Sequence, residues 1–197
     1  MRGKSKKYRE EAREEAREVI KLDDELARVL AAREKRWEKR LALVTSRKSC
    51  LVTITLCLPV AYRTQVAYEA LFHDLCDQFQ KILMTNGIRI SHEGFMTGED
   101  GPACFLTTDT EASQVKQVCV AAEDSMPGGR MLDIDVMDRE GNPIGRSELG
   151  LPPRKCFICE EPAAVCVSRK RHSKDELARQ IAILTEQAGG LQRSIDR

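Results

Sequence analysis

Leu51-Val52-Thr53-Ile54-Thr55-Leu56-Cys57-Leu58 is the stretch that decides the fold, because it is rich in β-branched residues and closes at Pro59. Such a run predicts a strand. The residues after it predict, in order, a helix over 64–84, strands over 88–96 and 103–107, a helix over 110–123 and a strand over 130–137. This β-α-β-β-α-β order predicts an α+β fold with a ferredoxin-like antiparallel sheet backed by two helices.

Smaller signals complete the central pattern. Thr64 is an N-cap type of residue and is expected to begin the first of these helices. A turn over 138–142 should lead into a short return strand near 143–146.

The two ends of the chain predict helices that flank this sheet. Residues 1–45 carry Glu/Arg pairs and a narrow, largely apolar seam, so they predict a charged helix. The seam residues are Leu22, Leu26, Val29, Leu30, Arg33, Trp37 and Leu41. Residues 173–187 predict an amphipathic helix capped by Ser173 and Glu176. We therefore expect a helical extension (1–45), an α+β core (46–150), and a Cys/His segment with its helix packed on the core (151–197).

Length and charge narrow the range of functions. A chain of 197 residues suffices for one well-cored domain with an appendage, and is too short for two full enzyme domains. The net charge is +1, so the chain lacks the overall positive charge typical of proteins that bind nucleic acid or anionic membranes. Residues 1–18 lack the apolar core of a secretory signal, and no run approaches the roughly 18 apolar residues of a membrane span. These features predict a soluble, cytoplasmic protein.

Asp133 and Asp135 are the first candidate site residues. They are two apart in an expected strand, so their side chains should point to the same side of it. Mg²⁺ prefers one or two carboxylates together with substrate phosphates, which fits such a pair. Arg130 precedes them, and Gly128-Gly129 is able to bring the backbone close to a phosphate. The alternative is that both aspartates are ordinary outward residues of a half-exposed strand.

Arg130, Arg146 and Arg154 flank the acidic pair in the sequence. A guanidinium group binds phosphate oxygens with two parallel hydrogen bonds, so we expect these arginines to bind phosphate groups. The alternatives are ordinary surface arginines and, for Arg154, structural support of the cysteines that follow it.

Three of the eight cysteines form a cluster in the sequence together with a histidine. Cys156, Cys159, Cys166 and His172 have the spacing C-x2-C-x6-C-x5-H, which is suitable for a structural Cys3His zinc site. Reduced free thiols are the second alternative. A redox Cys-x-x-Cys is the third, although it normally begins a helix, and here the motif follows Leu-Pro-Pro. The other five cysteines are expected to act as small apolar residues.

These motifs, taken together, resemble the apo-citrate lyase phosphoribosyl-dephospho-CoA transferase family over about residues 22–184. The matching residues are Arg33-Glu34-x-Arg36, Lys116, Gly129-Arg130-x-x-Asp133-Ile134-Asp135-Val136, Ile144-x-Arg146, Leu151-Pro152-Pro153-Arg154-x-Cys156-x-x-Cys159, Pro162-Ala163, Cys166 and His172. The resemblance implies a nucleotidyltransferase. Its donor would be 2'-(5''-triphosphoribosyl)-3'-dephospho-CoA and its acceptor a serine of the acyl carrier (gamma) subunit of apo-citrate lyase, with pyrophosphate released.

The resemblance also implies roles for individual residues. Asp133 and Asp135 would hold Mg²⁺ against the triphosphate, with Arg130 beside them. Arg146, Arg154, Lys116 and Arg63 would bind the substrate. Two other functions stay open: the analogous transferase for the malonate decarboxylase carrier, and a zinc-stabilised binding module without enzymatic activity.

Overall fold

A five-stranded antiparallel sheet forms the centre of the protein. The computed structural model describes the backbone of residues 2–189 and the side chains of residues 23–189. The strands are β1 (Cys50–Leu56), β2 (His92–Gly98), β3 (Gly101–Thr108), β4 (Leu132–Met137) and β5 (Pro143–Ile144). They lie in the order β2-β3-β1-β4-β5, so the first strand of the chain is the central strand of the sheet. Each neighbouring pair is antiparallel.

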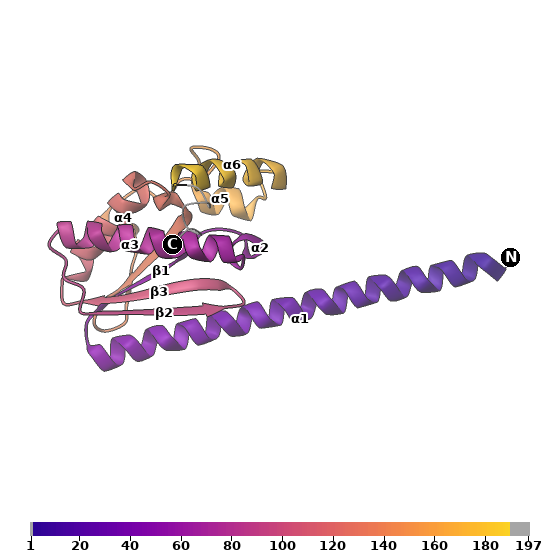
Figure 1. The fold of residues 1–197 in the computed structure, drawn as a ribbon, viewed down its shortest axis with the longest axis horizontal. Helices are drawn as coiled ribbons and strands as arrows, with labels where there is room; N and C mark the ends of the chain where they lie inside the picture. Colours follow the sequence, from indigo (N-terminus) through magenta and orange to yellow (C-terminus); the bar gives the residue numbers. More distant parts are fainter. Residues whose placement is uncertain (1, 190–197) are drawn as a thin grey trace.

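Helices lie against both faces of this sheet, as Figure 1 shows. The pair α3 (Val66–Thr85) and α4 (Ala112–Ser125) covers one face, and the end of α1 (Arg2–Arg47) packs on the other. The remaining helices are α2 (Val60–Arg63), α5 (Ala163–Ser168) and α6 (Lys174–Gln187), with short 3-10 turns η1 (Gly129–Met131) and η2 (Ser147–Leu149). Ile181 and Leu184 of α6 are buried in the same core as α3 and α4.

Side-chain alternation on β1 explains why both faces are covered. Val52 and Ile54 point into the large core beneath α3 and α4, whereas Leu51 packs with Phe105 and the end of α1. All three residues have no exposed surface, as expected for a central strand with apolar residues on both sides. A strand of this kind needs a layer on each face, and α1 supplies the second one.

Most of the fold prediction is confirmed. The protein is α+β, and the strands and helices follow the predicted order. The capping box of Ser173 and Glu176 is also present. The name ferredoxin-like and the three-part division of the chain stay predictions, and residues 1 and 190–197 of that division lie outside the described backbone.

Three local predictions were wrong. The strand predicted from residue 88 begins at His92. Thr64 does not begin a helix: it ends α2, and its hydroxyl donates to the carbonyl of Val60. The predicted N-cap is displaced because Pro59 starts a short helix that the pattern did not reveal. The strand predicted from Arg130 begins at Leu132, since η1 turns the chain just before it.

The apolar seam identified on α1 lies mostly on the exposed side of the helix. Val29 is buried, but Leu26, Leu30, Trp37 and Leu41 are 41–55% exposed. A neighbouring stripe faces the sheet, and its members are Val29, Ala32, Arg36, Arg40, Leu43 and Val44. Leu22 lies outside the described side chains.

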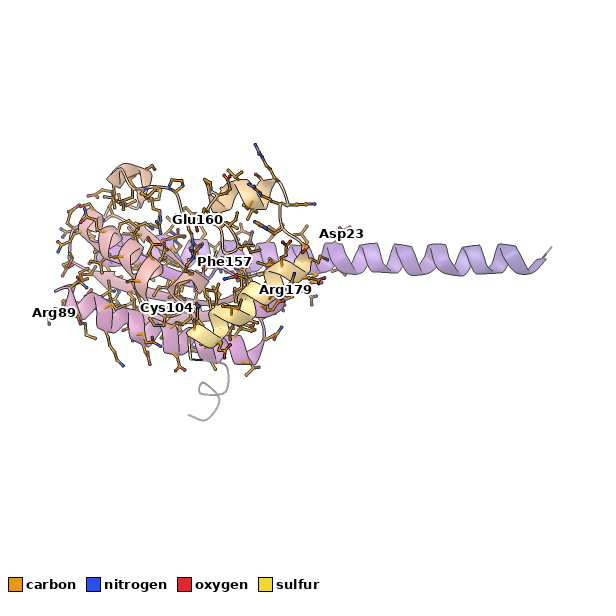
Figure 2. The ribbon with its side chains drawn as sticks, turned by 90° about the horizontal axis from the view of Figure 1, so that it is seen from above. Asp23, Arg89, Cys104, Phe157, Glu160 and Arg179 are labelled. Carbon is orange, nitrogen blue, oxygen red and sulfur yellow. The ribbon has the colours of Figure 1, made fainter. Side chains whose placement is uncertain are left out.

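In Figures 1 and 2 the part of α1 before about Asp23 extends away from the rest of the molecule. Within residues 2–189, no helix combines the length and apolar character that a membrane span requires.

Candidate active site

Asp133 and Asp135 lie side by side on one face of β4. They alternate with Leu132 and Ile134, which are buried, and each aspartate side chain is 54% exposed. On β1 their partners are Thr55 and Thr53, respectively. The two carboxylates therefore share one side of the strand, as the alternation predicted, and this is the face on which α1 packs.

An arginine contacts each of these carboxylates. A terminal nitrogen of Arg154 lies 3.4 Å from Oδ1 of Asp133, and one of Arg40 lies 3.1 Å from Oδ2 of Asp135. Burial, and then the negative charge of Asp135, raise the pKa of Asp133 above its ordinary value, although Arg154 opposes this effect. Two carboxylates that repel each other are suited to a divalent cation, which would favour their ionised forms.

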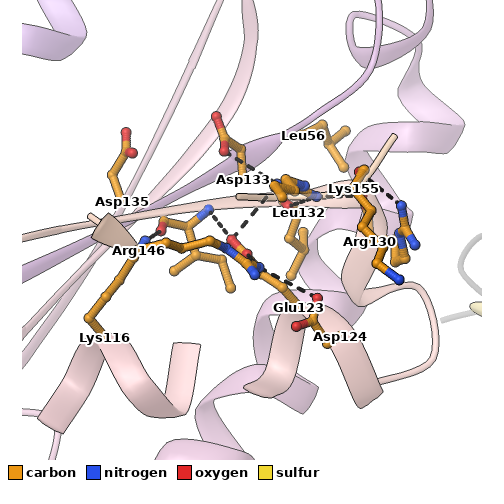
Figure 3. A network of polar contacts seen from close by, with 12 residues as sticks. Leu56, Lys116, Glu123, Asp124, Arg130, Leu132, Asp133, Asp135, Arg146 and Lys155 are labelled. Atoms are coloured by element: carbon orange, nitrogen blue, oxygen red, sulfur yellow. Dashed lines mark hydrogen bonds and ion pairs between the residues drawn. The ribbon is translucent and has the colours of Figure 1, made fainter. Parts of the chain in front are cut away.

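Two buried side chains bind the edge of β4 that does not pair with β1, as Figure 3 shows. Lys116 of α4 donates to the carbonyl of Ile134 at 2.6 Å, and the carboxylate of Glu123 accepts from the backbone N–H of Ile134 at 3.1 Å. Strand β5 pairs only with Val136 and Met137, so Ile134 has no strand partner on this edge. The two side chains complete its backbone hydrogen bonds and fix the position of the aspartates.

Glu123 is also the centre of an ion-pair network. Its second oxygen lies 2.7 Å from a terminal nitrogen of Arg146, which also lies 3.4 Å from Asp124. Arg154 approaches the first oxygen at 3.8 Å. The carboxylate is 4% exposed, so most of its charge is compensated by protein groups rather than by water.

Arg130 and Arg154 form a reciprocal clasp between β4 and the Cys/His segment. Arg154 donates to the carbonyls of Arg130 and Leu132 at 2.7 and 2.8 Å. Arg130 donates in return to the carbonyls of Lys155 and Cys156. The expected support of the cysteine segment by Arg154 is thus shared between the two arginines.

Gly128 and Gly129 serve close packing in this structure. A Cβ on Gly129 would lie 2.4 Å from the carbonyl oxygen of Ala122, and Gly128 has a φ of +73° that favours glycine. A Cβ on Gly128 would also lie within 2.8 Å of Leu75 and Ala188. Both glycines therefore allow η1 to approach α4 and its neighbours.

Cys156, Cys159, Cys166 and His172 come together after the clasp. One ligand atom from each lies within 4.8 Å of the others, and Cys159 Sγ is 3.5 Å from Cys166 Sγ and 3.4 Å from His172 Nε2. Burial opposes ionisation of Cys156, but the N–H groups of Ile158 and Cys159 prevail and lower its pKa. Four such atoms at these separations suit a tetrahedral metal such as zinc.

The remaining predicted residue, Arg63, lies on α2. It donates to the carbonyl of Leu56 at 3.4 Å, and its stem lies next to Gly101 in the β2–β3 hairpin. The sequence reasoning missed Glu123 and Arg40 entirely. A charged residue on the core-facing stripe of α4 was the available signal for Glu123.

The fold and the acidic pair together indicate a class of protein. A pair of carboxylates on an antiparallel sheet, surrounded by arginines, is suited to a transferase that acts on phosphate esters with a divalent cation. The family model for apo-citrate lyase phosphoribosyl-dephospho-CoA transferase matches residues 24–188. The chain therefore belongs to this family, and it is an enzyme of the nucleotidyltransferase kind.

Individual relatives agree with the family assignment. Proteins named apo-citrate lyase phosphoribosyl-dephospho-CoA transferase from Shigella flexneri serotype 5b and Escherichia coli O1:K1 are each 28% identical to this chain over 156 residues. One from Escherichia coli O7:K1 is 27% identical over the same length. In each case the match covers 79% of this chain and 85% of the relative.

Proposed function

We propose that this enzyme transfers the phosphoribosyl-dephospho-CoA group from 2'-(5''-triphosphoribosyl)-3'-dephospho-CoA to a serine of the apo-citrate lyase acyl carrier subunit. In the balanced reaction the serine oxygen attacks the phosphorus next to the ribose and forms a phosphodiester. The bond from that phosphorus to the next phosphate breaks, so pyrophosphate leaves, and a base takes up the proton of the serine hydroxyl. Membership of the family supports the donor and the acceptor. The observation that carries the proposal is the pair Asp133 and Asp135 on the accessible face of β4.

Asp133 and Asp135 are proposed to hold Mg²⁺. The ion would supply positive charge to the triphosphate and to the leaving pyrophosphate. The raised pKa of Asp133 supports this role, because a carboxylate destabilised by burial and by a second carboxylate gains most from a cation. We also propose that one of the two aspartates orients the serine hydroxyl or accepts its proton.

Arg130, Arg146, Arg154 and Lys116 are proposed to act mainly by positioning β4. Each already donates to a carbonyl or carboxylate of the protein. Arg154 also contacts Asp133 and would orient that carboxylate toward the metal. The Cys/His cluster is proposed to hold a structural zinc ion that fastens the segment joined to β4 by the clasp.

Intact-mass spectrometry of the carrier subunit tests the proposal. The apo-carrier is incubated with the enzyme, Mg²⁺ and the triphosphorylated donor, and its mass should rise by that of phosphoribosyl-dephospho-CoA. A carrier with its acceptor serine replaced by alanine is the control. An unchanged mass with properly folded enzyme would refute the proposed reaction.

The cytoplasmic location stays a prediction.

A further inference from the structure

Unpaired polar atoms gather on the side of the sheet that α1 covers. Among the described side chains, five buried nitrogen or oxygen atoms lack a hydrogen-bond partner, and they belong to Arg36, Arg40, Thr53, Arg63 and Asp100. The atoms of Arg36 and Asp100 form an ion pair with each other. This leaves Nε of Arg40, Nε of Arg63 and the hydroxyl of Thr53. Buried polar atoms in native proteins nearly always have a partner, so three of them in one region indicate a missing polar partner.

Thr53 and Arg40 lie next to Asp135 of the proposed metal site, and Arg63 lies at one end of the same central strand. Thr53 is 2% exposed and lies opposite Asp135 in the β1–β4 register, so its hydroxyl faces the same side of the sheet. Arg40 contacts Asp135 directly. Arg63 approaches from the other end of β1, where it donates to the carbonyl of Leu56. Leu56 pairs with Leu132, the residue that precedes Asp133 on β4.

The charges of two further arginines and one aspartate act on Arg63. Burial, and then the charge of Arg33, lower the pKa of Arg63, and Arg36 acts in the same direction. Asp100 is the carboxylate that opposes these arginines, and it is already paired with Arg36. A half-buried group of arginines that repel one another is stable only if a further anion, or water, compensates it.

We propose that Arg40, Arg63 and Thr53, with Arg33 and Arg36 beside them, form a binding site for the phosphate groups of a polyphosphate ester. Guanidinium groups donate in pairs to phosphate oxygens, and the threonine hydroxyl donates a further hydrogen bond. The site adjoins Asp135, so a phosphate bound there would lie next to a cation held by the aspartates. The end of α1 is then part of the active site, and its arginines hold the triphosphate of the donor. This last assignment rests on the proposed function.

The test measures binding of inorganic tripolyphosphate to the full-length protein by isothermal titration calorimetry, with and without Mg²⁺. Arg40→Gln and Arg63→Gln should each weaken binding by about 10–100-fold, the loss expected for one charge-assisted hydrogen-bonding group. Lys35→Gln is the control, because it removes one positive charge from an exposed position of the same helix. The affinity of the Lys35→Gln variant for tripolyphosphate should differ from that of the wild type by less than about threefold.

Thr53→Val provides a variant that keeps the shape of the side chain. Removing an unpaired buried hydroxyl should raise the melting temperature of the ligand-free protein while it weakens tripolyphosphate binding. A lower melting temperature with unchanged binding would mean that protein or water already satisfies the hydroxyl.

Failure of this site can be separated from failure of the proposed function. If the arginine variants bind tripolyphosphate as the Lys35→Gln variant does, and modify the carrier with an unchanged KM for the donor, the site is refuted and the reaction stands. If the wild type binds tripolyphosphate and loses that binding in the variants but leaves the carrier unmodified, the site stands and the reaction is refuted.

Discussion

The carboxylate of Glu123 is buried and contacts Ile134, Arg146 and Arg154 in the network behind β4. Glu123→Gln keeps its size and the oxygen that accepts the Ile134 N–H, but removes the charge that faces Arg146 at 2.7 Å. Arg146, 14% exposed, then retains only Asp124, which is 61% exposed and 3.4 Å away. A hydrogen bond to a charged group contributes about 1.5–3 kcal/mol. We expect Glu123→Gln to lower the free energy of unfolding by about 2 kcal/mol, and the melting temperature by roughly 4–8 °C.

Urea denaturation followed by circular dichroism measures this effect. The midpoint should fall with an unchanged slope, because the surface exposed on unfolding stays the same. Asp124→Asn is the matched control: it removes the exposed partner of the same arginine and should change stability by less than about 0.5 kcal/mol. If the two variants have equal stability within that margin, the buried ion pair does not stabilise the protein as described.

Asp133→Asn should slow transfer by about 10²–10³-fold, measured as the rate of carrier modification. Because burial and Asp135 raise the pKa of Asp133, the folded state holds its proton more tightly than the unfolded state. Stability is therefore lost as the pH rises through the raised pKa, and calorimetry at pH 7 without Mg²⁺ should give Asp133→Asn an equal or higher melting temperature. A clear decrease would contradict this. Cys159→Ser should abolish binding of about one Zn²⁺ per chain in elemental analysis, whereas Cys104→Ser should retain it. Arg130→Lys should weaken zinc binding about 10–100-fold in chelator competition. Lysine cannot donate to the carbonyls of Lys155 and Cys156 as the guanidinium does, so the ligands would be less well positioned. Unchanged zinc affinity would mean that the clasp does not support the metal site.

Local sequence patterns were enough for the longer helices and the strands, and for two motifs. Alternation of Asp133 and Asp135 with apolar neighbours predicted their common face, because side-chain direction on a strand has a fixed period of two. The spacing of Cys156, Cys159, Cys166 and His172 predicted a cluster, and their ligand atoms do converge. Such signals depend on neighbours within a few residues, which the sequence displays directly.

The partners of the charged residues depend on tertiary structure. Phosphate binding by Arg130 and Arg154 stays a prediction, and their reciprocal contacts with carbonyls arise from the path of the chain between them. Lys116 and Glu123 gained their roles because β5 is too short to cover Ile134.

The composition of the site was also decided by the fold. Helix α1 has two adjacent stripes of different character, and its periodicity alone did not say which one meets the sheet. The stripe that packs carries Arg36 and Arg40, and it brings Arg40 to Asp135, a residue 95 positions away in the sequence. The sequence therefore determined which residues share a face of each element. The packing of α1 determined which charges meet, because contacts between distant segments depend on how whole surfaces fit together.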